Sequence, residues 1–213
     1  MSITFNNVKV PILHEFEPAE ESVWKKGAFL LTSQKNLVYA TSGKGKTTFL
    51  NLIYGIRKDY TGNILIFERD IKSFSDDDWS KIRREKISMV FQDLRLFDNL
   101  SVGENLILKN DLTQMFSESK IKEMLAEFDL QDKWNQTCGT LSQGQKQRIA
   151  ILRSLLQPFD FILLDEPFSH LDGQNAEKSW EIIERETKRN NAGIIISSLS
   201  NQTWFTPDQK LII

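Results

Sequence analysis

The sequence is poor in cysteine, in histidine and in long apolar runs. Its single cysteine, Cys138, excludes a disulfide within the chain and fits a reducing compartment. The longest apolar runs, such as Phe161 to Leu164, are far shorter than the roughly 20 residues that span a bilayer. Met1 to Val10 has no basic region, which argues against a secretory signal. We therefore expect no direct membrane insertion, and any attachment to a membrane must go through another protein.

An excess of charge of one sign is also missing. The chain has 27 Lys and Arg against 29 Asp and Glu, which leaves a net charge of -2. A chain this balanced lacks the field that holds nucleic acid or acidic lipid, so we expect no nucleic-acid partner. With 213 residues, 40% of them hydrophobic and 26% charged, the sequence predicts one globular unit around one well-filled core.

Short apolar runs recur along the chain and alternate with helical patterns. A first strand is predicted around Ile3 and Phe5, with a turn or bulge at Asn6-Asn7, and a second strand from Val23 to Leu31. Further strands are predicted at Leu37 to Tyr39, Ile64 to Phe67, Ile87 to Phe91, Phe161 to Leu164, Ile194 to Ile196 and Lys210 to Ile213. This alternation predicts an α/β fold with a parallel sheet covered on both faces.

Residues from about 95 to 157 read as wholly helical. The apolar residues Ile121 to Phe128 follow helical spacing, and Ser117 or Ser119 could cap that helix. Another helix is predicted around Glu177 to Lys188, with apolar residues on one face. We expect the segment 95–157 to form a helical subdomain.

A phosphate-binding loop follows the predicted strand that ends at Tyr39. Glycines let successive backbone amides turn toward a triphosphate, and the positive end of the next helix faces the same anion. Lys46 is expected to reach the β- and γ-phosphates, and the Thr47 hydroxyl to bind Mg²⁺. The first glycine of the usual pattern is Ala40 here. The residues expected to bind the nucleotide are Thr41, Ser42, Gly43, Lys44, Gly45, Lys46, Thr47 and Thr48.

A phosphate loop alone is compatible with kinases, GTPases and many ATPases. Two further motifs indicate which of these classes of protein the chain belongs to. The apolar run from Phe161 ends in Asp165 and Glu166, as a buried strand would deliver acids at its carboxyl end. Asp165 is expected to hold Mg²⁺, and Glu166 to orient or deprotonate the attacking water. Upstream, Ser142 and Gln145 predict a capping box at the start of a helix, which suits the binding of a γ-phosphate.

Together these motifs resemble the ABC ATPase family. Leu141 to Gln145 is similar to its Leu-Ser-Gly-Gly-Gln signature, with Gln143 in place of the first glycine. Gln92 matches its Q-loop, and Ser169 to Asp172 matches its D-loop. The likeness spans about residue 22 to the end and is greatest to the stand-alone ATPases of lipoprotein-releasing, macrolide-exporting and cell-division complexes.

The resemblance implies a single ABC ATPase domain of the P-loop NTPase class. It implies a mostly parallel core, formed by about 1–94 and 158–213 with an N-terminal antiparallel β part, and an inserted helical signature subdomain at about 95–157. Two such domains sandwich ATP and Mg²⁺ head to tail, as a homodimer or a pseudo-symmetric dimer, and drive a transmembrane permease from the cytoplasmic face of the cell membrane.

In such a sandwich each residue of the site has an implied role. Ser142, Gly144 and Gln145 act in trans on the partner's nucleotide. Gln92 contacts Mg²⁺ or the attacking water, so Glu166, Gln92 and Lys46 are the expected catalytic residues and Thr47, Gln92 and Asp165 the expected metal ligands.

One position departs from the family pattern. Ser198 stands where the family has its switch histidine, and a serine can bond a γ-phosphate but offers no imidazole. We therefore hypothesise that hydrolysis is slow, or that the subunit works in an assembly whose timing does not need that histidine. His170, in the D-loop, could instead serve the dimer interface. The aromatic residue that stacks on adenine is left open among His14, Phe16 and Trp24.

Three other functions compete with transport. An ATP-gated switch with slow hydrolysis and little transport stays open because of Ala40 and Ser198. A soluble ABC ATPase acting on DNA or ribosomes is disfavoured, because those relatives carry a long coiled coil or two cassettes in one chain. A nucleoside kinase leaves the signature and the D-loop unexplained.

Overall fold

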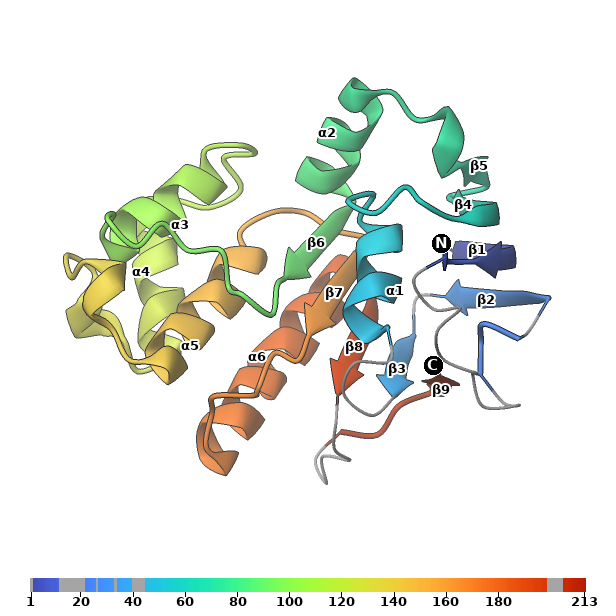
Figure 1. The fold of residues 1–213 in the computed structure, drawn as a ribbon. Coiled ribbons are helices and arrows are strands. Elements are labelled where there is room, and N and C mark those ends of the chain that lie inside the picture. Colours follow the sequence, from blue (N-terminus) through green and yellow to red (C-terminus); the bar gives the residue numbers. More distant parts are fainter. Residues whose placement is uncertain (1, 12–21, 26, 33, 40–44, 199–204) are drawn as a thin grey trace.

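The computed structural model describes residues 2–11, 22–25, 27–32, 34–39, 45–198 and 205–213. Two sheets and a set of helices make up this part of the chain (Figure 1). Ala40 and the predicted nucleotide-binding residues Thr41 to Lys44 lie outside it, as do His14 and Phe16.

The larger sheet is parallel throughout, as the sequence predicts. Its strands, in spatial order, are β6 (Ile87–Val90), β7 (Phe161–Asp165), β8 (Gly193–Ser198), β3 (Lys35–Tyr39) and β9 (Gln209–Ile212). Almost all residues of β6, β7 and β8 are buried, because both faces of the sheet are covered.

The smaller sheet is antiparallel. Its order is β2 (Ala28–Thr32), β1 (Ser2–Lys9), β4 (Thr61–Ile66) and β5 (Arg69–Asp70). The predicted irregularity in β1 is confirmed: the register shifts between Asn6 and Lys9, and Asn7 has φ 49°.

Two strand predictions were wrong. The run Ile64 to Phe67 was expected in the parallel sheet, but β4 alternates between buried and more exposed residues and turns back into β5 as a hairpin. The strand expected from Val23 starts only at Ala28, because Val23 to Lys25 form a turn in which Lys25 N donates to Ser22 O.

The helices begin at side-chain caps in most cases. They are α1 (Lys46–Ile53), α2 (Asp76–Glu85), α3 (Val102–Asn110), α4 (Glu118–Glu127), α5 (Gln143–Ser154) and α6 (Gly173–Asn190), with short 3-10 turns at Ile71–Ser73, Gln131–Lys133 and Cys138–Thr140. Ser117 rather than Ser119 caps α4, and the predicted Ser142 and Gln145 capping box at α5 is confirmed. Ile56 lies beyond the end of α1 and is 42% exposed.

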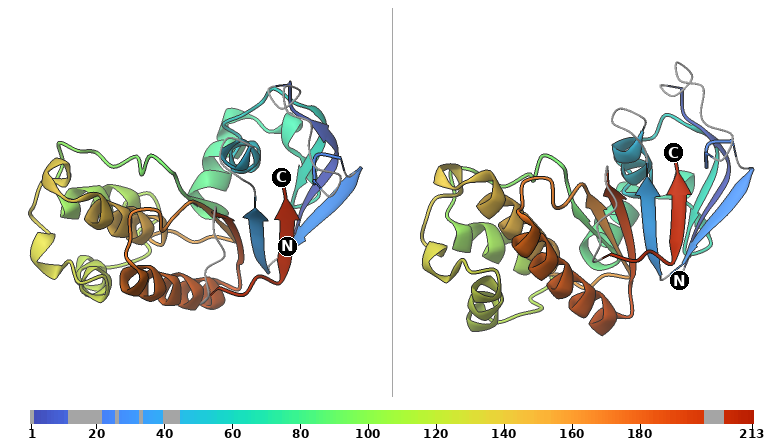
Figure 2. Two further views of the ribbon diagram at one scale, coloured as in Figure 1. Left: turned by 60° about the horizontal axis from the view of Figure 1, so that its bottom comes forward. Right: turned by 90° about the horizontal axis from the view of Figure 1, so that it is seen from below.

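The parallel sheet separates two hydrophobic cores. Phe161 and Leu163 of β7 point to the core that holds α1 and the antiparallel sheet, whereas Ile162 and Leu164 point to the core that holds α5 and α6. Figures 1 and 2 show α1 and α6 on opposite sides of the sheet, with α3 and α4 gathered beyond α5. None of the described helices is long and apolar enough to cross a membrane.

Candidate functional site

The site forms where the parallel strands end. Because β3, β6, β7 and β8 run in the same direction, the residues that follow them meet at one edge of the sheet. Gln92 follows β6, Asp165 ends β7 with Glu166 directly after it, and Ser197 and Ser198 end β8. Gln92 and Ser197, which are more than 100 positions apart in the sequence, therefore share this edge, and β7 and β8 pair there through Asp165 and Ser197.

The helix that follows β3 brings its amino end to this edge. Gly45 precedes α1 with φ 97°, a conformation that glycine adopts without strain, and no side chain caps the helix. The first backbone amides of α1 can therefore bind an anion, which the helix dipole also favours. Lys46 is 5% exposed, and Thr47 next to it is exposed.

Lys46 and Glu166 form an ion pair in this site. Lys46 Nζ lies 3.4 Å from Glu166 Oε1, and their side chains are 5% and 17% exposed. Lys46, which is expected to bind phosphate, and Glu166, which is expected to act on water, therefore lie next to each other.

Asp165 is buried, and its two carboxylate oxygens differ. Oδ1 accepts a hydrogen bond of 2.6 Å from Ser197 Oγ, whereas Oδ2 is buried without a hydrogen-bond partner among the described residues. A buried carboxylate oxygen without a donor is costly unless a cation or another donor meets it. Asp165 is therefore the residue best prepared to hold a cation.

Ser197 was missed by the sequence analysis. Its hydroxyl donates to Asp165 Oδ1 and accepts from the backbone N of Glu166 at 3.0 Å, so it links both acids. Ser198, which was singled out instead, is the next residue of β8. The register that places Ser197 beside Asp165 is a property of the sheet and gives no signal in the local sequence.

Thr47 and Gln92 also meet. Thr47 Oγ1 lies 3.4 Å from Gln92 Oε1, which brings together two of the three predicted metal ligands. The described residues hold no cluster of three or more His, Cys, Asp or Glu side chains that could bind a metal alone. A hard cation in this place would need oxygens from a phosphate to complete its shell, as Mg²⁺ commonly does.

The start of α5 forms a second part of the candidate site. Ser142 caps α5 and is exposed, with Gln145 N donating to Ser142 Oγ and Ser142 N donating to Gln145 Oε1. Gly144 lies against the D-loop, where an added Cβ would come within 2.9 Å of His170 O. Figures 1 and 2 show α5 and α1 on opposite sides of β6 and β7.

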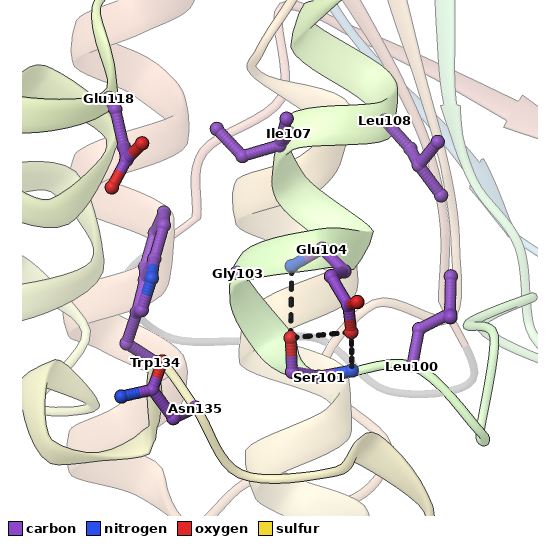
Figure 3. Close-up of a pocket in the computed structure, with 9 residues that line it drawn as sticks. All are labelled: Leu100, Ser101, Gly103, Glu104, Ile107, Leu108, Glu118, Trp134 and Asn135. Atoms are coloured by element: carbon purple, nitrogen blue, oxygen red, sulfur yellow. Dashed lines mark hydrogen bonds between the residues drawn. The ribbon is translucent and has the colours of Figure 1, made fainter.

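A separate pocket of about 600 Å³ lies on α3. Figure 3 shows Trp134 and Glu118 on one side of α3 and Leu100 and Leu108 on the other. Its two carboxylates are already engaged, Glu104 in a capping box with Ser101 and Glu118 in an ion pair with Lys122. Its carboxylates would repel a triphosphate and no Lys or Arg side chain lines it, so this pocket is not the nucleotide site.

The sequence matches a family model described as ABC transporter over residues 33–169. The chain belongs to this family. The matched segment contains the phosphate loop, Gln92, the signature at the start of α5 and the acids that end β7, so the resemblance inferred from the motifs is confirmed. The chain is an ABC ATPase, which binds and hydrolyses ATP.

Individual relatives agree with this assignment. The chain is 34% identical to the lipoprotein-releasing system ATP-binding protein LolD of Buchnera aphidicola subsp. Schizaphis graminum, over 73% of this chain and 70% of that protein. It is 33% identical to the cell division ATP-binding protein FtsE of Bacillus subtilis, over 83% of this chain and 77% of that protein. The predicted likeness to lipoprotein-releasing and cell-division ATPases is confirmed.

Solved structures support the fold. A dimeric bacterial ABC transporter cassette superposes with a TM-score of 0.77 at 26% identity, over 93% of this chain and 88% of that one. The same cassette in a post-hydrolysis state bound to ADP and Pi gives a TM-score of 0.77 at 27% identity, over 94% and 88%. The predicted P-loop ABC fold, with its parallel core, antiparallel β part and inserted helices, is confirmed.

One aromatic candidate for stacking on adenine lies among the described residues. The ring of Trp24 meets Phe49 of α1 edge to face, with centroids 5.9 Å apart. Trp24 therefore packs on the core around the phosphate-loop helix.

Proposed function

We propose that this ABC ATPase powers a separate transmembrane permease at the cytoplasmic face of the cell membrane. Two ATP-binding chains, identical or homologous, close on ATP and reopen after hydrolysis. The relatives named for a lipoprotein-releasing system and for methionine import support a transport role. They favour it over an ATP-gated switch with little transport.

The observation that carries the proposal is the cluster of Lys46, Asp165, Glu166 and Ser197 at the edge of the parallel sheet. Lys46 binds the β- and γ-phosphates, and Glu166 accepts the proton of the attacking water. Gln92 orients that water. The loop residues Thr41 to Lys44, together with Gly45 and Thr48, complete the phosphate cradle.

Mg²⁺ fits the donor set of this site. Thr47 Oγ1, Gln92 Oε1 and Asp165 Oδ2, which has no hydrogen-bond partner among the described residues, are oxygen atoms of the kind Mg²⁺ prefers, and these residues would hold the ion. When bound, Mg²⁺ neutralises charge on the phosphate oxygens. Ser197 keeps Asp165 oriented toward that place.

The signature residues Ser142, Gly144 and Gln145 act on the nucleotide of the partner chain. Two features support this: α5 and α1 lie on opposite sides of β6 and β7 within one chain, and Ser142 is exposed at the amino end of α5. Ser198, at the end of β8, contacts the γ-phosphate in place of a histidine. Hydrolysis is slow for that reason.

The test compares wild type with Glu166→Gln. ATP turnover is measured by a coupled assay, and ATP-dependent dimerisation by light scattering on the same samples. We expect wild type to hydrolyse ATP and the variant to accumulate as an ATP-bound dimer. Dimerisation of both proteins without turnover would favour the switch instead, and absence of ATP binding by both would refute the proposal.

A second comparison tests the coupling to transport. The complex with its permease is reconstituted in vesicles, and ATP turnover is measured with and without candidate transported molecules. Stimulated turnover supports transport. For Ser198, a turnover comparable to that of histidine-bearing relatives and unchanged in Ser198→Ala would contradict the assigned contact.

A further inference from the structure

Gln147 lies in the second turn of α5 and is 1% exposed. Its side-chain amide is used at both ends. Nε2 donates to the backbone O of Glu166 at 3.2 Å, and Oε1 accepts from the backbone N of His170 at 3.0 Å. Oε1 also lies 3.0 Å from His170 Nδ1. A buried amide with partners on both sides has one orientation, so Gln147 is a fixed link between α5 and the segment Glu166 to His170.

Glu166 needs such a link because its backbone is strained. Its φ is 48°, in the left-handed region that side-chain-bearing residues rarely adopt. Hydrogen bonds on both sides hold it there: its N donates to Ser197 Oγ, and its O accepts from Gln147 Nε2 at 3.2 Å and from Ser169 N at 3.3 Å. These bonds set the direction of the side chain, which places Oε1 3.4 Å from Lys46 Nζ.

We propose that Gln147 is a positioning residue for ATP hydrolysis, which fixes the backbone of Glu166 and makes the direction of that side chain depend on the position of α5. The inference rests on the proposed role of Glu166 as the base.

The same end of α5 touches the D-loop at a second point. The close approach of Gly144 to His170 O leaves no room for a side chain between them. A shift of the amino end of α5, as it meets a nucleotide held by the partner chain, therefore moves Gln147 and the carbonyl of Glu166 with it. Each site senses through Gln147 whether its own signature is engaged.

A purely structural role for Gln147 makes a different prediction, and the chain offers a matched control. Gln157 follows α5, is 0% exposed, and also donates from Nε2 to a backbone carbonyl, that of Pro158 at 3.3 Å. Its contacts lie away from Glu166. Gln157 Oε1 is buried without a hydrogen-bond partner among the described residues, so Gln157→Leu is expected to change the melting temperature little. Of the two variants, only Gln147→Leu is expected to alter hydrolysis.

The experiment uses the full chain with Gln147→Leu, Gln157→Leu, Glu166→Gln and the double variant Gln147→Leu with Glu166→Gln. It measures kcat and KM for ATP, ATP affinity at equilibrium, and Tm. We expect Gln147→Leu to lower kcat about tenfold or more with ATP affinity within about twofold of wild type, and Gln157→Leu to keep kcat within about twofold. An unchanged kcat in Gln147→Leu, or an equal loss in Gln157→Leu, overturns the proposal.

The double variant separates action through Glu166 from any other route. If Gln147 works only through that residue, adding Gln147→Leu to Glu166→Gln causes no further loss of the residual hydrolysis. A multiplicative loss overturns the proposal. Wild-type hydrolysis by Glu166→Gln alone refutes the assignment of the base instead, so the two failures are distinguishable.

Gln147→Glu keeps the shape of the side chain and the acceptor for His170 N but removes the donor to Glu166 O. It also serves if the leucine variant does not fold. We expect kcat to fall about as far as in Gln147→Leu. Wild-type kcat in Gln147→Glu would show that the bond to Glu166 O is dispensable, and would overturn the proposal.

Discussion

Lys46 and Glu166 are each other's partner, with Nζ 3.4 Å from Oε1. A γ-phosphate that enters the site competes with the carboxylate of Glu166 for the amine. We therefore expect Glu166→Gln to bind ATP about three- to tenfold more tightly than wild type, because the competing anion is gone. Titration with a fluorescent ATP analogue measures this. Lys46→Met is the counterpart and should weaken binding at least about tenfold, and an unchanged affinity in Glu166→Gln would contradict the competition.

Ser197 is expected to matter for both stability and turnover. Ser197→Ala removes the hydroxyl that bonds Asp165 and Glu166, which leaves the buried Asp165 Oδ1 and the partly buried N of Glu166 without that partner and should cost about 1–3 kcal/mol of unfolding free energy. We also expect a fall in kcat of about tenfold, since both acids lose their orientation.

The matched control for this change is Ser88 on β6. It is 1% exposed, and its hydroxyl donates to Ser154 O at 2.6 Å. Ser88→Ala should lower the unfolding free energy to a similar extent in urea titrations while kcat stays near wild type. Equal effects of Ser88→Ala and Ser197→Ala on kcat would refute the orienting role.

Arg153 at the end of α5 is expected to hold the segment after Gln92. Its guanidinium donates 2.7 Å hydrogen bonds to Leu94 O and Arg95 O, and these two residues have φ 59° and 49°. Burial lowers the pKa of Arg153 from its usual value. Arg153→Met should cost about 1.5–3 kcal/mol and release the strained segment.

Hydrogen exchange of the amides near Gln92 measures that release directly. We expect faster exchange over 93–96 in Arg153→Met together with a lower kcat. Arg189, whose side chain is 63% exposed and pairs with Glu186, is the control. Unchanged exchange in Arg153→Met would show that residues 93–96 keep their conformation without the hydrogen bonds from Arg153.

Ser142 caps α5 and is proposed to contact the ATP of the partner chain, and one substitution separates these two roles. Aspartate caps helices as well as serine does, so Ser142→Asp should keep the stability of the isolated chain. Its negative charge would face the phosphates of the partner's ATP, and we expect ATP-dependent dimerisation and turnover to fall at least about tenfold. Ser117, which caps α4 and has Lys120 rather than an acid at the third helical position, is the control, and Ser117→Asp should leave turnover unchanged. Normal dimerisation of Ser142→Asp would contradict action in trans.

Lys109 of α3 should make stability depend on alkaline pH. Burial, followed by the charge of Arg153, lowers the pKa of Lys109 from 10.5 to about 8. Between these two values the unfolded chain binds the extra proton, so the unfolding free energy contributed by this group rises with pH from about 8 to 10.5. Lys109→Met should be more stable than wild type at pH 7 and lack that rise, as measured by urea unfolding at several pH values. Parallel curves for the two proteins would refute the shift, and Lys188→Met on the exposed end of α6 is the control.

Sequence patterns predicted the parallel core and the helix caps because both are local. Apolar runs such as Phe161 to Leu164 specify strands buried on both faces, and the spacing of Ser142 and Gln145 specifies a capping box. The pattern failed for Ile64 to Phe67, because a short apolar run does not reveal which sheet it joins. Only the hairpin into β5 and the pairing with β1 decide that.

The sequence by itself determined the family, the ATPase activity and the residues expected to bind phosphate, because these depend on residue types at fixed local spacing. The tertiary structure decided which residues from distant parts of the sequence position these phosphate-binding and catalytic residues. Ser197 joins Asp165 only through the register of β7 and β8, and Gln147 reaches the carbonyl of Glu166 only because α5 packs against the turn after β7. Hydrogen bonds between residues 19 and 32 positions apart follow from how strands and helices pack, and no local pattern encodes them.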